Sequence, residues 1–450
     1  MIEDTICAPS TPPIVSPIAI IRISGPDSLR ALSLIFNRPD LLKSRYAAYG
    51  SIMDGERIID DVVSVYYKSP ASYTGEDMAE IFCHGNPIIV NQVLKLLNRL
   101  DIRMAEPGEF TRRAFINGKM DLTEAEAINQ IVRARSEWEI EAALHQMHGS
   151  LRSIIGSIRS DLITLRADIE CSIDFADDPV EFVSRDQAME RLSHVRNNLQ
   201  DILRRCSISE KLSHGLDIPL VGKPNAGKSS ILNLILNSER AIVSDTPGTT
   251  RDVIRETVQF SGLMVNLYDT AGINETGCEI ERKGIQMSHQ KIETASIIIM
   301  VLDATTGLEQ ADEAVIKLIQ KKPVIYLLNK IDAVEQDATV IRTRLGERVI
   351  AFSAKTGQGL EDLEKEIASI LEKELIEFRN SFISDIRIIT LLEKALSNVD
   401  TVSKLITEDS PPEITAFEIQ NLLDLLAEIT GEISPDDILD SVFTRFCIGK

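Results

Sequence analysis

The sequence predicts a multidomain protein that combines mixed α/β domains with a helical domain. At roughly 150 residues per domain, a chain of 450 residues suggests two to four domains. Residues 1–118 carry short apolar runs broken by Pro, Gly and Asp. Residues 119–212 and 376–450 have helical texture, and residues 213–375 alternate apolar runs with helical segments. We therefore expect an α/β domain followed by a helical domain in two halves, with a second α/β domain inserted between the halves. Three consecutive domains are the alternative.

Strands and long helices account for the first two domains. The short runs Ile18–Ile23 and Val62–Tyr67 lie between breakers and predict strands. After Pro179, which ends the helix before it, Gln187–Leu212 predicts another helix. The earlier helix is predicted by apolar residues three and four positions apart, which form one buried face: Leu151, Ile154, Ile155, Ile158, Leu162, Leu165 and Ile169.

The inserted segment has the texture of a parallel sheet. Its apolar runs include Ile218–Val221, Val265–Tyr268 and Val324–Leu328, and a helical segment, Ser229–Leu236, follows the first of them. Strands that alternate with helices in this way form a parallel sheet with crossover helices.

Composition excludes several classes of protein. The 48 Lys+Arg against 69 Asp+Glu give a net charge of −21, which argues against a generic polyanion-binding surface. The six Cys include no C-x-x-C pair, which favours free thiols in a reducing cytoplasm over disulfides or structural zinc. The strongest apolar run, Ser296–Leu302, is far shorter than the ~20 residues of a membrane span. We expect a soluble cytoplasmic protein with no membrane segment.

Residues 222–229 read G-K-P-N-A-G-K-S, the spacing of a phosphate-binding loop between a strand and a helix. Its glycines let backbone N–H groups surround phosphate oxygens, and the helix N-terminus adds positive potential. Lys228 is expected to reach the β- and γ-phosphates, and the Ser229 hydroxyl to bind Mg²⁺. The expected nucleotide contacts in this loop are Asn225, Ala226, Gly227, Lys228, Ser229 and Ser230.

Further motifs at strand ends select guanine. A carboxylate at Asp332 can accept hydrogen bonds from N1–H and the exocyclic amine of guanine, and adenine does not offer this pair of donors. A site of this kind rejects analogues by roughly 10⁴–10⁵. The motifs D-T-A-G, N-K-I-D and S-A-K therefore predict a P-loop GTPase domain of the Ras-like kind. Their expected contacts are Asp269, Thr270, Ala271, Gly272, Asn329, Lys330, Asp332, Ser353, Ala354 and Lys355.

The segment between the first two motifs should act as the GTPase switch, and one of its threonines should complete the Mg²⁺ shell. Ras-like sites use a glutamine after D-x-x-G to orient the attacking water, but Ile273 occupies that position here. Arg251, Arg282 or a bound cation would then neutralise the transition-state charge. The expected contacts of the segment are Ser244, Asp245, Thr246, Pro247, Gly248, Thr249 and Thr250.

Two residues near this site have more than one interpretation. The Asn225 side-chain oxygen, with carbonyls of Ser244 and Thr246, could surround a monovalent cation, or Asn225 could only shape the turn. Glu281 could act through a water as a general base, or it could occupy a solvated helix position.

The chain resembles the MnmE (TrmE) family of tRNA-modification GTPases over essentially its full length. The G-domain motifs are shared with several bacterial GTPases, so the terminal segments make the resemblance specific. The matching segments are Gly222–Ser230, Pro247–Asp252, Asp269–Gly272, Tyr73–Asp77, Pro107–Phe115, Asn117–Leu122 and Phe446–Lys450.

The resemblance implies an N-terminal folate-binding domain that forms a homodimer, and a G domain inserted into the helical domain. It also implies stimulation by K⁺, a role for Glu281 in water activation, and Mg²⁺ at Ser229 and Thr250. With the FAD-dependent partner MnmG (GidA), the family installs an aminomethyl-type group at carbon 5 of the wobble uridine of certain tRNAs. The one-carbon donor is 5,10-methylene- or 5-formyl-tetrahydrofolate. The implied K⁺ ligands are Asn225, Ser244, Thr246 and Thr249, and the implied folate contacts are Arg22, Glu80, Lys119 and Lys450.

Several points stay open at this stage. The N-terminal loop carries Ser16-Pro17 where the family has a Gly-rich stretch. Arg112, Arg113 and Lys119 could meet folate glutamates or RNA, or be solvated. Cys447 could be a nucleophile or a small buried apolar residue. A ribosome-assembly or signalling GTPase, and a folate-dependent transferase with a regulatory G domain, are the competing functions.

Overall fold

The computed structural model describes twelve stretches of the chain. They are residues 4–134, 136–174, 183–213, 215–236, 255–260, 263–269, 295–319, 322–334, 345–346, 348–379, 386–433 and 436–449. The chain divides into two compact units. Unit 1 comprises residues 1–132, 146–199 and 390–450, and unit 2 comprises residues 133–145 and 200–389. Unit 1 is therefore interrupted in sequence by unit 2.

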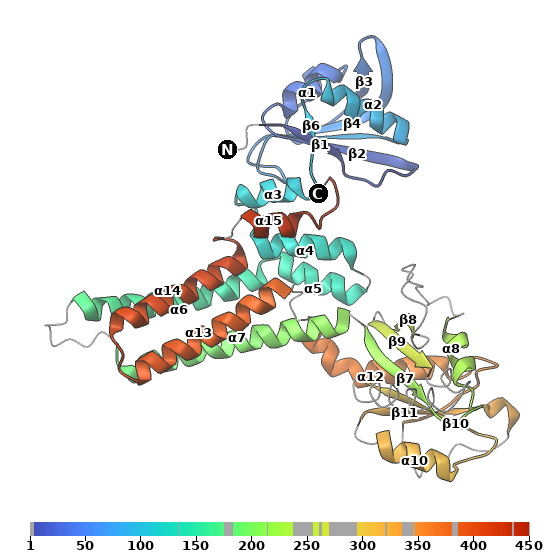
Figure 1. The fold of residues 1–450 in the computed structure, drawn as a ribbon. Coiled ribbons are helices and arrows are strands. Elements are labelled where there is room, and N and C mark those ends of the chain that lie inside the picture. Colours follow the sequence, from blue (N-terminus) through green and yellow to red (C-terminus); the bar gives the residue numbers. More distant parts are fainter. Residues whose placement is uncertain are drawn as a thin grey trace, which may run out of the picture. The chain divides into compact units, whose positions relative to one another are not determined.

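A mixed six-stranded sheet, in the order β3-β4-β5-β2-β1-β6, forms the N-terminal part of unit 1 (Figure 1). Its pairs are antiparallel except β1–β6. The predicted strand runs 18–23 and 62–67 lie inside β2 and β4. The strands are β1 (Ile6–Pro9), β2 (Ser16–Ser24), β3 (Ala47–Asp54), β4 (Arg57–Tyr67), β5 (Met78–Gly85) and β6 (Arg103–Met104).

The two faces of this sheet differ in what covers them. Helices α1 (Ser28–Ile35) and α2 (Pro87–Asn98) pack on one face over residues such as Ile21, Ile23 and Ile81, which are all fully buried. Because side chains alternate along a strand, the neighbouring residues Arg22 and Glu80 point to the other face. That face therefore carries the polar groups described below. The departure at Ser16-Pro17 coincides with a register shift between Ser16 and Ala19, where β2 begins to pair with β5.

The helices of the chain follow the predicted periodicity. The long predicted helix is α6, in which Leu151, Ile155, Ile158, Leu162 and Leu165 are buried. It packs beside α14, and Arg159 reaches Glu432 at 2.5 Å. The helices are α3 (Glu109–Ile116), α4 (Leu122–Arg133), α5 (Glu137–Met147), α6 (Ser150–Asp174), α7 (Arg185–Ser213), α13 (Ile386–Thr407), α14 (Pro412–Thr430) and α15 (Asp436–Phe443).

The last helix of the chain packs against an early one within unit 1. Phe443 and Phe446 join Leu122 in one apolar cluster, with Phe115 of α3 against it. A Cβ on Gly108 would lie 2.4 Å from the Phe443 carbonyl oxygen, so this approach of α15 requires glycine. No helix in the described ranges is both long and apolar enough to cross a bilayer.

Unit 2 contains a second six-stranded sheet, in the order β12-β11-β10-β7-β9-β8. The predicted parallel sheet is confirmed for every pair except β8–β9, which is an antiparallel edge pair that the apolar runs did not reveal. The strands are β7 (Leu216–Val221), β8 (Arg255–Phe260), β9 (Leu263–Asp269), β10 (Ile298–Asp303), β11 (Val324–Asn329) and β12 (Val349–Ala351). The described helices are α8 (Lys228–Leu236), α10 (Gln310–Ile319) and α12 (Leu360–Arg379).

Candidate functional site

The loop between β7 and α8 holds the phosphate-binding motif. Gly227 has φ of 100°, a backbone conformation that favours glycine, and a Cβ there would lie 2.2 Å from Asn329 Nδ2. α8 begins at the next residue, so the N–H groups of its first turn open into the loop. The sequence thus places a helix N-terminus directly at the loop where phosphate oxygens are expected.

The lysine of the motif is buried, with 4% of its surface exposed. Lys228 Nζ donates to the carbonyl oxygens of Gly222 at 2.7 Å and Lys223 at 2.8 Å. Its ammonium group therefore lies within the loop, where it can neutralise phosphate charge. Ser229 and Ser230 follow in the first turn of α8 and are exposed.

Asn329, at the end of β11, ties the phosphate loop to the guanine-selecting segments. Its Nδ2 donates to the Ala226 carbonyl at 2.8 Å, and its Oδ1 accepts from the Ala354 backbone N–H at 3.0 Å. The side chain is 1% exposed. One neutral amide thus uses both its donor and its acceptor to hold two loops in register.

Asp332 is oriented by Ser353, which lies in the loop after β12. The Ser353 hydroxyl donates to Asp332 Oδ1 at 2.7 Å, and this hydrogen bond, helped by the charge of Lys355, lowers the pKa of Asp332 below its usual value. The group is therefore a carboxylate at neutral pH, the form that accepts two N–H donors. Lys330 adopts φ of 70° and pairs with Asp303 Oδ2 at 2.7 Å. Sequence reasoning missed Asp303, which ends β10 without any motif to mark it.

Several predicted site residues lie outside the described residues. Asp269 ends β9. Asn225 lies within the described residues. Its φ of 63° fits the turn-shaping interpretation, and the residue is exposed. The predicted residues outside the described ranges are Ser244, Asp245, Thr246, Pro247, Gly248, Thr249, Thr250, Thr270, Ala271, Gly272, Glu281 and Lys450.

A second candidate site lies on the open face of the N-terminal sheet in unit 1. A polar pocket of about 480 Å³ is lined by Arg45, Tyr67, Tyr73, Glu80 and Lys119, among others. The structure therefore brings together two of the predicted folate contacts, Glu80 and Lys119, from positions 39 residues apart (119 minus 80).

Glu80 is held by the side chains of an arginine and a tyrosine. Arg22 Nε and Nη2 both donate to Glu80 Oε1, at 3.0 and 2.9 Å, while the Tyr67 hydroxyl donates to Oε2 at 3.2 Å. Burial and then the nearby Glu80 charge raise the pKa of Tyr67, so its hydroxyl keeps its proton. Arg22 also lies over the rings of Tyr73 and Phe110, at 5.2 and 5.7 Å from their centroids.

The C-terminal segment reaches the same place. Arg22 Nη1 donates to the Gly449 carbonyl at 3.3 Å, and the Ser10 hydroxyl donates to the same oxygen at 3.2 Å. Lys450, the adjacent residue, lies outside the described ranges. The chain position of Gly449 gives no hint of this contact, because 427 residues separate it from Arg22.

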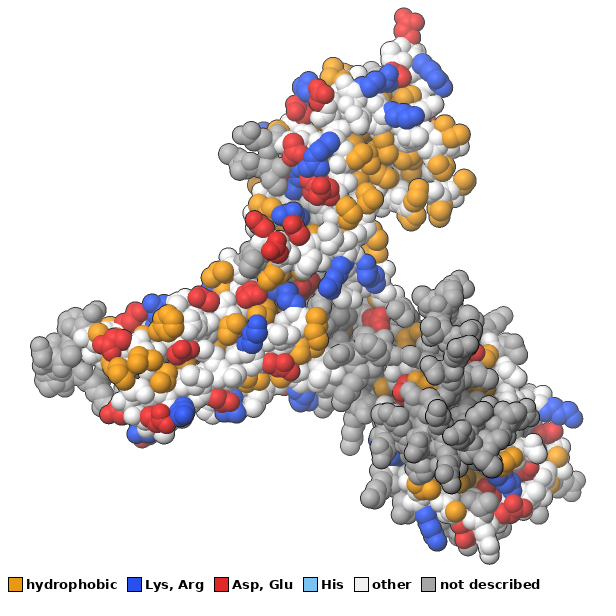
Figure 2. All heavy atoms as spheres, viewed as in Figure 1, with side chains coloured by type: hydrophobic (Ala, Val, Ile, Leu, Met, Phe, Trp, Pro, Cys, Tyr) orange, Lys and Arg blue, Asp and Glu red, His pale blue; other side chains and the backbone are white. Residues whose placement is uncertain are grey.

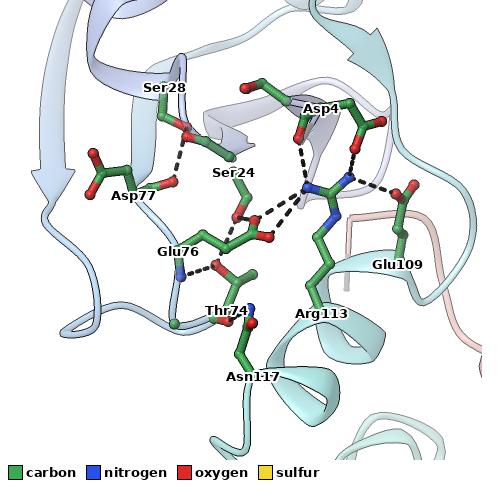
Figure 3. A network of polar contacts seen from close by, with 12 residues as sticks. Asp4, Ser24, Ser28, Thr74, Glu76, Asp77, Glu109, Arg113 and Asn117 are labelled. Atoms are coloured by element: carbon green, nitrogen blue, oxygen red, sulfur yellow. Dashed lines mark hydrogen bonds and ion pairs between the residues drawn. The ribbon is translucent and has the colours of Figure 1, made fainter. Parts of the chain in front are cut away.

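The basic cluster expected at residues 112–119 is not a common patch. Arg113 is completely buried and pairs with Asp4 at 2.8 Å, Glu109 at 3.0 Å and Glu76 at 3.3 Å, as Figure 3 shows. The three readings of this residue as a folate contact, an RNA contact or a solvated charge are therefore wrong. Arg112 instead pairs with Asp440 at 3.0 Å.

The Arg113 network braces the segment before β5. Glu76 accepts from the Ser24 hydroxyl at 2.7 Å, and Asn117 Nδ2 donates to the Thr74 carbonyl at 2.8 Å (Figure 3). Tyr73, which lines the pocket, belongs to the same segment. The buried charges thus fix one wall of the pocket.

Cys447 is exposed, so its interpretation as a small buried residue is wrong.

Comparison with protein families gives two matches. Residues 5–119 match the family described as the GTP-binding protein TrmE N-terminus, and residues 122–447 match the MnmE helical domain family. Together the two matches cover the sheet pocket, the helices and the nucleotide loop.

Individual relatives agree with the family matches. The tRNA modification GTPase MnmE of Thermotoga maritima is 40% identical over 451 residues, which is 99% of this chain and 100% of that protein. The one from Aquifex aeolicus is 40% identical over 455 residues and 100% of both chains. Among solved structures, Era in complex with MgGDPNP and 16S ribosomal RNA is 30% identical over 35% of this chain and 56% of that chain, with a TM-score of 0.29. From the family matches and the full-length relatives, the chain belongs to the MnmE family of tRNA modification GTPases.

Proposed function

We propose that this protein hydrolyses GTP and, with an FAD-dependent MnmG (GidA) partner, adds an aminomethyl-type group at carbon 5 of the wobble uridine of certain tRNAs. The observation that supports it most is the joint held by Asn329, which links the phosphate loop at Ala226 to the guanine-facing loop at Ala354. The tRNA substrate follows from the names of the full-length relatives.

The assigned GTP contacts are those predicted from the motifs. Asp332 would accept the guanine N–H groups, and Lys228 would neutralise phosphate charge from its position inside the loop. Ser229, in the first turn of α8, would hold Mg²⁺ together with Thr250, and the ion would balance charge on the β- and γ-phosphates. Ser229 is an exposed residue, and its hydroxyl has the hard oxygen that Mg²⁺ prefers.

We also assign potassium stimulation to the chain. Asn225, Ser244, Thr246 and Thr249 would supply oxygen ligands, and K⁺ would contribute positive charge near the β/γ bridge in place of an arginine finger. Ile273 stands where Ras-like sites have the glutamine that orients the attacking water. Glu281 would orient the attacking water. Exposure of the Asn225 side chain at the phosphate loop is compatible with a ligand role.

The test is turnover in matched salts. We expect GTP hydrolysis to be much faster in KCl than in NaCl at equal ionic strength, and ATP hydrolysis to be undetectable in both. Asn225→Ala should remove the difference between the salts. Equal GTP rates in KCl and NaCl for the unmodified protein would refute the potassium assignment and leave the GTPase assignment intact.

The folate assignment is supported by the sheet pocket. A pterin presents an amine and a ring N–H along one edge, and a carboxylate is the group that accepts both. Glu80 offers that carboxylate inside a pocket of about 480 Å³, with Arg22 behind it and Lys119 at the rim. Lys450 would join from the segment that already reaches Arg22. The donor would be 5,10-methylene- or 5-formyl-tetrahydrofolate, which supplies the one-carbon unit when bound.

Binding of 5-formyl-tetrahydrofolate to the full-length protein, measured by equilibrium dialysis, tests this pocket. Glu80→Gln should abolish measurable binding without changing the GTP hydrolysis rate. Asp61→Asn, on the neighbouring strand β4, is the matched control and should bind normally. Unchanged binding by Glu80→Gln would refute the assignment.

Homodimer formation is supported by the open face of the same sheet. Ile18, Tyr49 and Val63 are 58%, 62% and 37% exposed there. Figure 2 shows hydrophobic side chains gathered on the N-terminal part of unit 1, where Figure 1 places α2 and β2. Apolar groups in such number on one face are typical of a protein interface. We expect a dimer by analytical ultracentrifugation, and a shift toward monomer for Tyr49→Asp.

The domain boundaries and cellular location complete the proposal. We assign residues 1–118 to the folate domain, 119–212 with 376–450 to the helical domain, and 213–375 to the G domain. The interruption of unit 1 by unit 2 supports an inserted G domain. A cytoplasmic location is assigned from the pattern of free thiols. Mass spectrometry of tRNA from a deletion strain should show the wobble modification missing, whereas unchanged tRNA would favour a ribosome-assembly or signalling role.

A further inference from the structure

The backbone at Arg45 is held in an unusual conformation at the rim of the sheet pocket. Its φ of 60° lies in the left-handed region, which residues other than glycine, asparagine and aspartate adopt only when the surrounding structure fixes them. Here the Arg45 N–H donates to the Tyr66 carbonyl at 2.7 Å, and the Lys68 N–H donates to the Ser44 hydroxyl at 3.1 Å. The hydrogen bonds on both sides therefore hold the strained residue in place, with its side chain lining the pocket.

Arg45 and Lys119 meet at the same loop from distant parts of the chain. Arg45 Nη2 donates to the Ala71 carbonyl at 3.2 Å, and Lys119 Nζ donates to the carbonyl of the preceding residue, Pro70, at 3.0 Å. Both cations line the pocket. Consecutive carbonyls of one loop thus hold two positive charges at one rim.

The charge of the pocket lining is unbalanced. Glu80 is the carboxylate that lines it, and Arg22 already neutralises that charge through a contact at 2.9 Å. Within the described residues, the hydrogen bonds of Arg45 and Lys119 go to neutral backbone carbonyls instead. In a chain with a net charge of −21, two such cations at one rim favour an anionic ligand.

We propose that Arg45, together with Lys119, binds the carboxylates of the glutamyl tail of the folate carrier and makes the pocket selective for polyglutamylated forms. The proposal rests on the folate-binding function proposed above. Glu80 would receive the pterin edge, so the tail would extend toward the rim, where each further glutamate brings one more carboxylate to the cations. Arginine suits this task because its fork donates two parallel hydrogen bonds to one carboxylate.

The experiment compares tail lengths on the full-length protein. Dissociation constants are measured by equilibrium dialysis for 5-formyl-tetrahydropteroate, which has no tail, and for its mono- and triglutamate forms. Ion pairs at a solvated rim are individually weak, so we expect the triglutamate to bind about tenfold more tightly than the tail-less form. This gain should shrink at high salt, because the rim is solvated.

Two variants and a control isolate Arg45. Arg45→Gln should reduce the tail-length gain to less than about twofold and leave binding of the tail-less form unchanged, whereas Arg45→Lys should keep most of the gain. Arg57→Gln, an exposed arginine in the β3–β4 hairpin, is the matched control and should keep all of it.

Different failures point to different conclusions. Tail-independent binding by the unmodified protein, or a full gain in Arg45→Gln, would overturn this inference alone. Loss of the tail-less form by Arg45→Gln would also overturn it, because Arg45 would then shape the pocket instead of reading the tail. If the unmodified protein bound no form, the folate assignment itself would fall.

Discussion

In the nucleotide site, two neutral side chains hold the guanine-facing loops beside the Lys330–Asp303 ion pair, whereas in the sheet pocket arginine–carboxylate pairs hold the walls. Asn329 and Ser353 hold the guanine-facing loops with an amide and a hydroxyl, at distances from 2.7 to 3.0 Å. In unit 1, Arg22 and the buried Arg113 hold the pocket walls through carboxylates. Neutral hydrogen bonds keep their geometry at any pH in the working range, while the ion pairs depend on every partner keeping its charge.

The two sites also differ in how they are distributed along the chain. The nucleotide contacts come in short motifs at the ends of parallel strands, which meet at one edge of a sheet. The pocket collects residues from separate places in the chain, such as Arg45, Glu80 and Lys119, and Arg22, which pairs with Glu80, also contacts Gly449. Motif spacing can therefore reveal the first site and not the second.

Replacing Asp332 should produce the largest effect. It tests whether the neutral side chains Asn329 and Ser353 serve to place this one carboxylate against guanine. Asp332→Asn removes the acceptor for guanine N–H groups, so kcat/KM for GTP should fall by roughly 10⁴, while xanthosine triphosphate becomes the better substrate. Steady-state kinetics with both nucleotides measure the change. The control is Asp362→Asn in the exposed first turn of α12, which should behave like the unmodified protein. An unchanged preference for GTP would contradict the assignment.

Arg113→Met tests the ion pairs that hold the pocket wall in unit 1. It removes a completely buried cation from three carboxylates, two of which, Glu76 and Glu109, are largely buried, and breaking such a buried pair costs about 3–5 kcal/mol. Urea unfolding should show this loss. The neighbouring Arg112→Met breaks a half-exposed pair with Asp440 and should cost less than about 1 kcal/mol. Equal losses for the two variants would show that burial of the charge is not what matters.

Gly227→Ala tests the neutral side chain Asn329 in the nucleotide site. A methyl group would collide with Asn329 Nδ2 and would also strain a φ of 100°, so GTP affinity should fall about a hundredfold. Gly307→Ala is the matched control, because its φ is 69° but no atom lies within 4 Å of the added methyl. The control should lower stability without lowering GTP affinity. If both variants bound GTP normally, the contact with Asn329 would not be essential.

The smallest expected effect is a dependence of stability on pH in unit 1. Burial alone would raise the pKa of Glu109, but hydrogen bonds from Arg103 and Arg113 outweigh it, and the pKa lies below the usual 4.5. A lowered pKa stabilises the fold fully above the usual value and loses that contribution as pH falls through the lowered value. Glu109→Gln should therefore flatten the fall in unfolding free energy below about pH 4.5. Glu56→Gln, in the exposed β3–β4 turn, should keep the unmodified slope; an unmodified slope in Glu109→Gln would contradict the role of this carboxylate.

Sequence reasoning could find the elements whose cause is local. The helical face of α6 and the strands that lead into the nucleotide motifs follow from periodicity and turn residues. The antiparallel strand β8 escaped because its run has few apolar residues and its pairing is set by the neighbouring β9. Arg113 was misread for the same reason: only the fold brings Asp4 and Glu76 to it, and its own neighbours look like a basic patch.

The bond between Arg22 and the Gly449 carbonyl has a consequence for biosynthesis. The two partners are 427 residues apart, and the whole of unit 2 is translated between them. At roughly 5–20 residues per second, a ribosome needs on the order of 20 to 90 s to travel that distance. During that time the first sheet lacks the C-terminal segment that contacts Arg22. A nascent chain stalled anywhere before α15 would therefore expose this face of the sheet to chaperones and proteases.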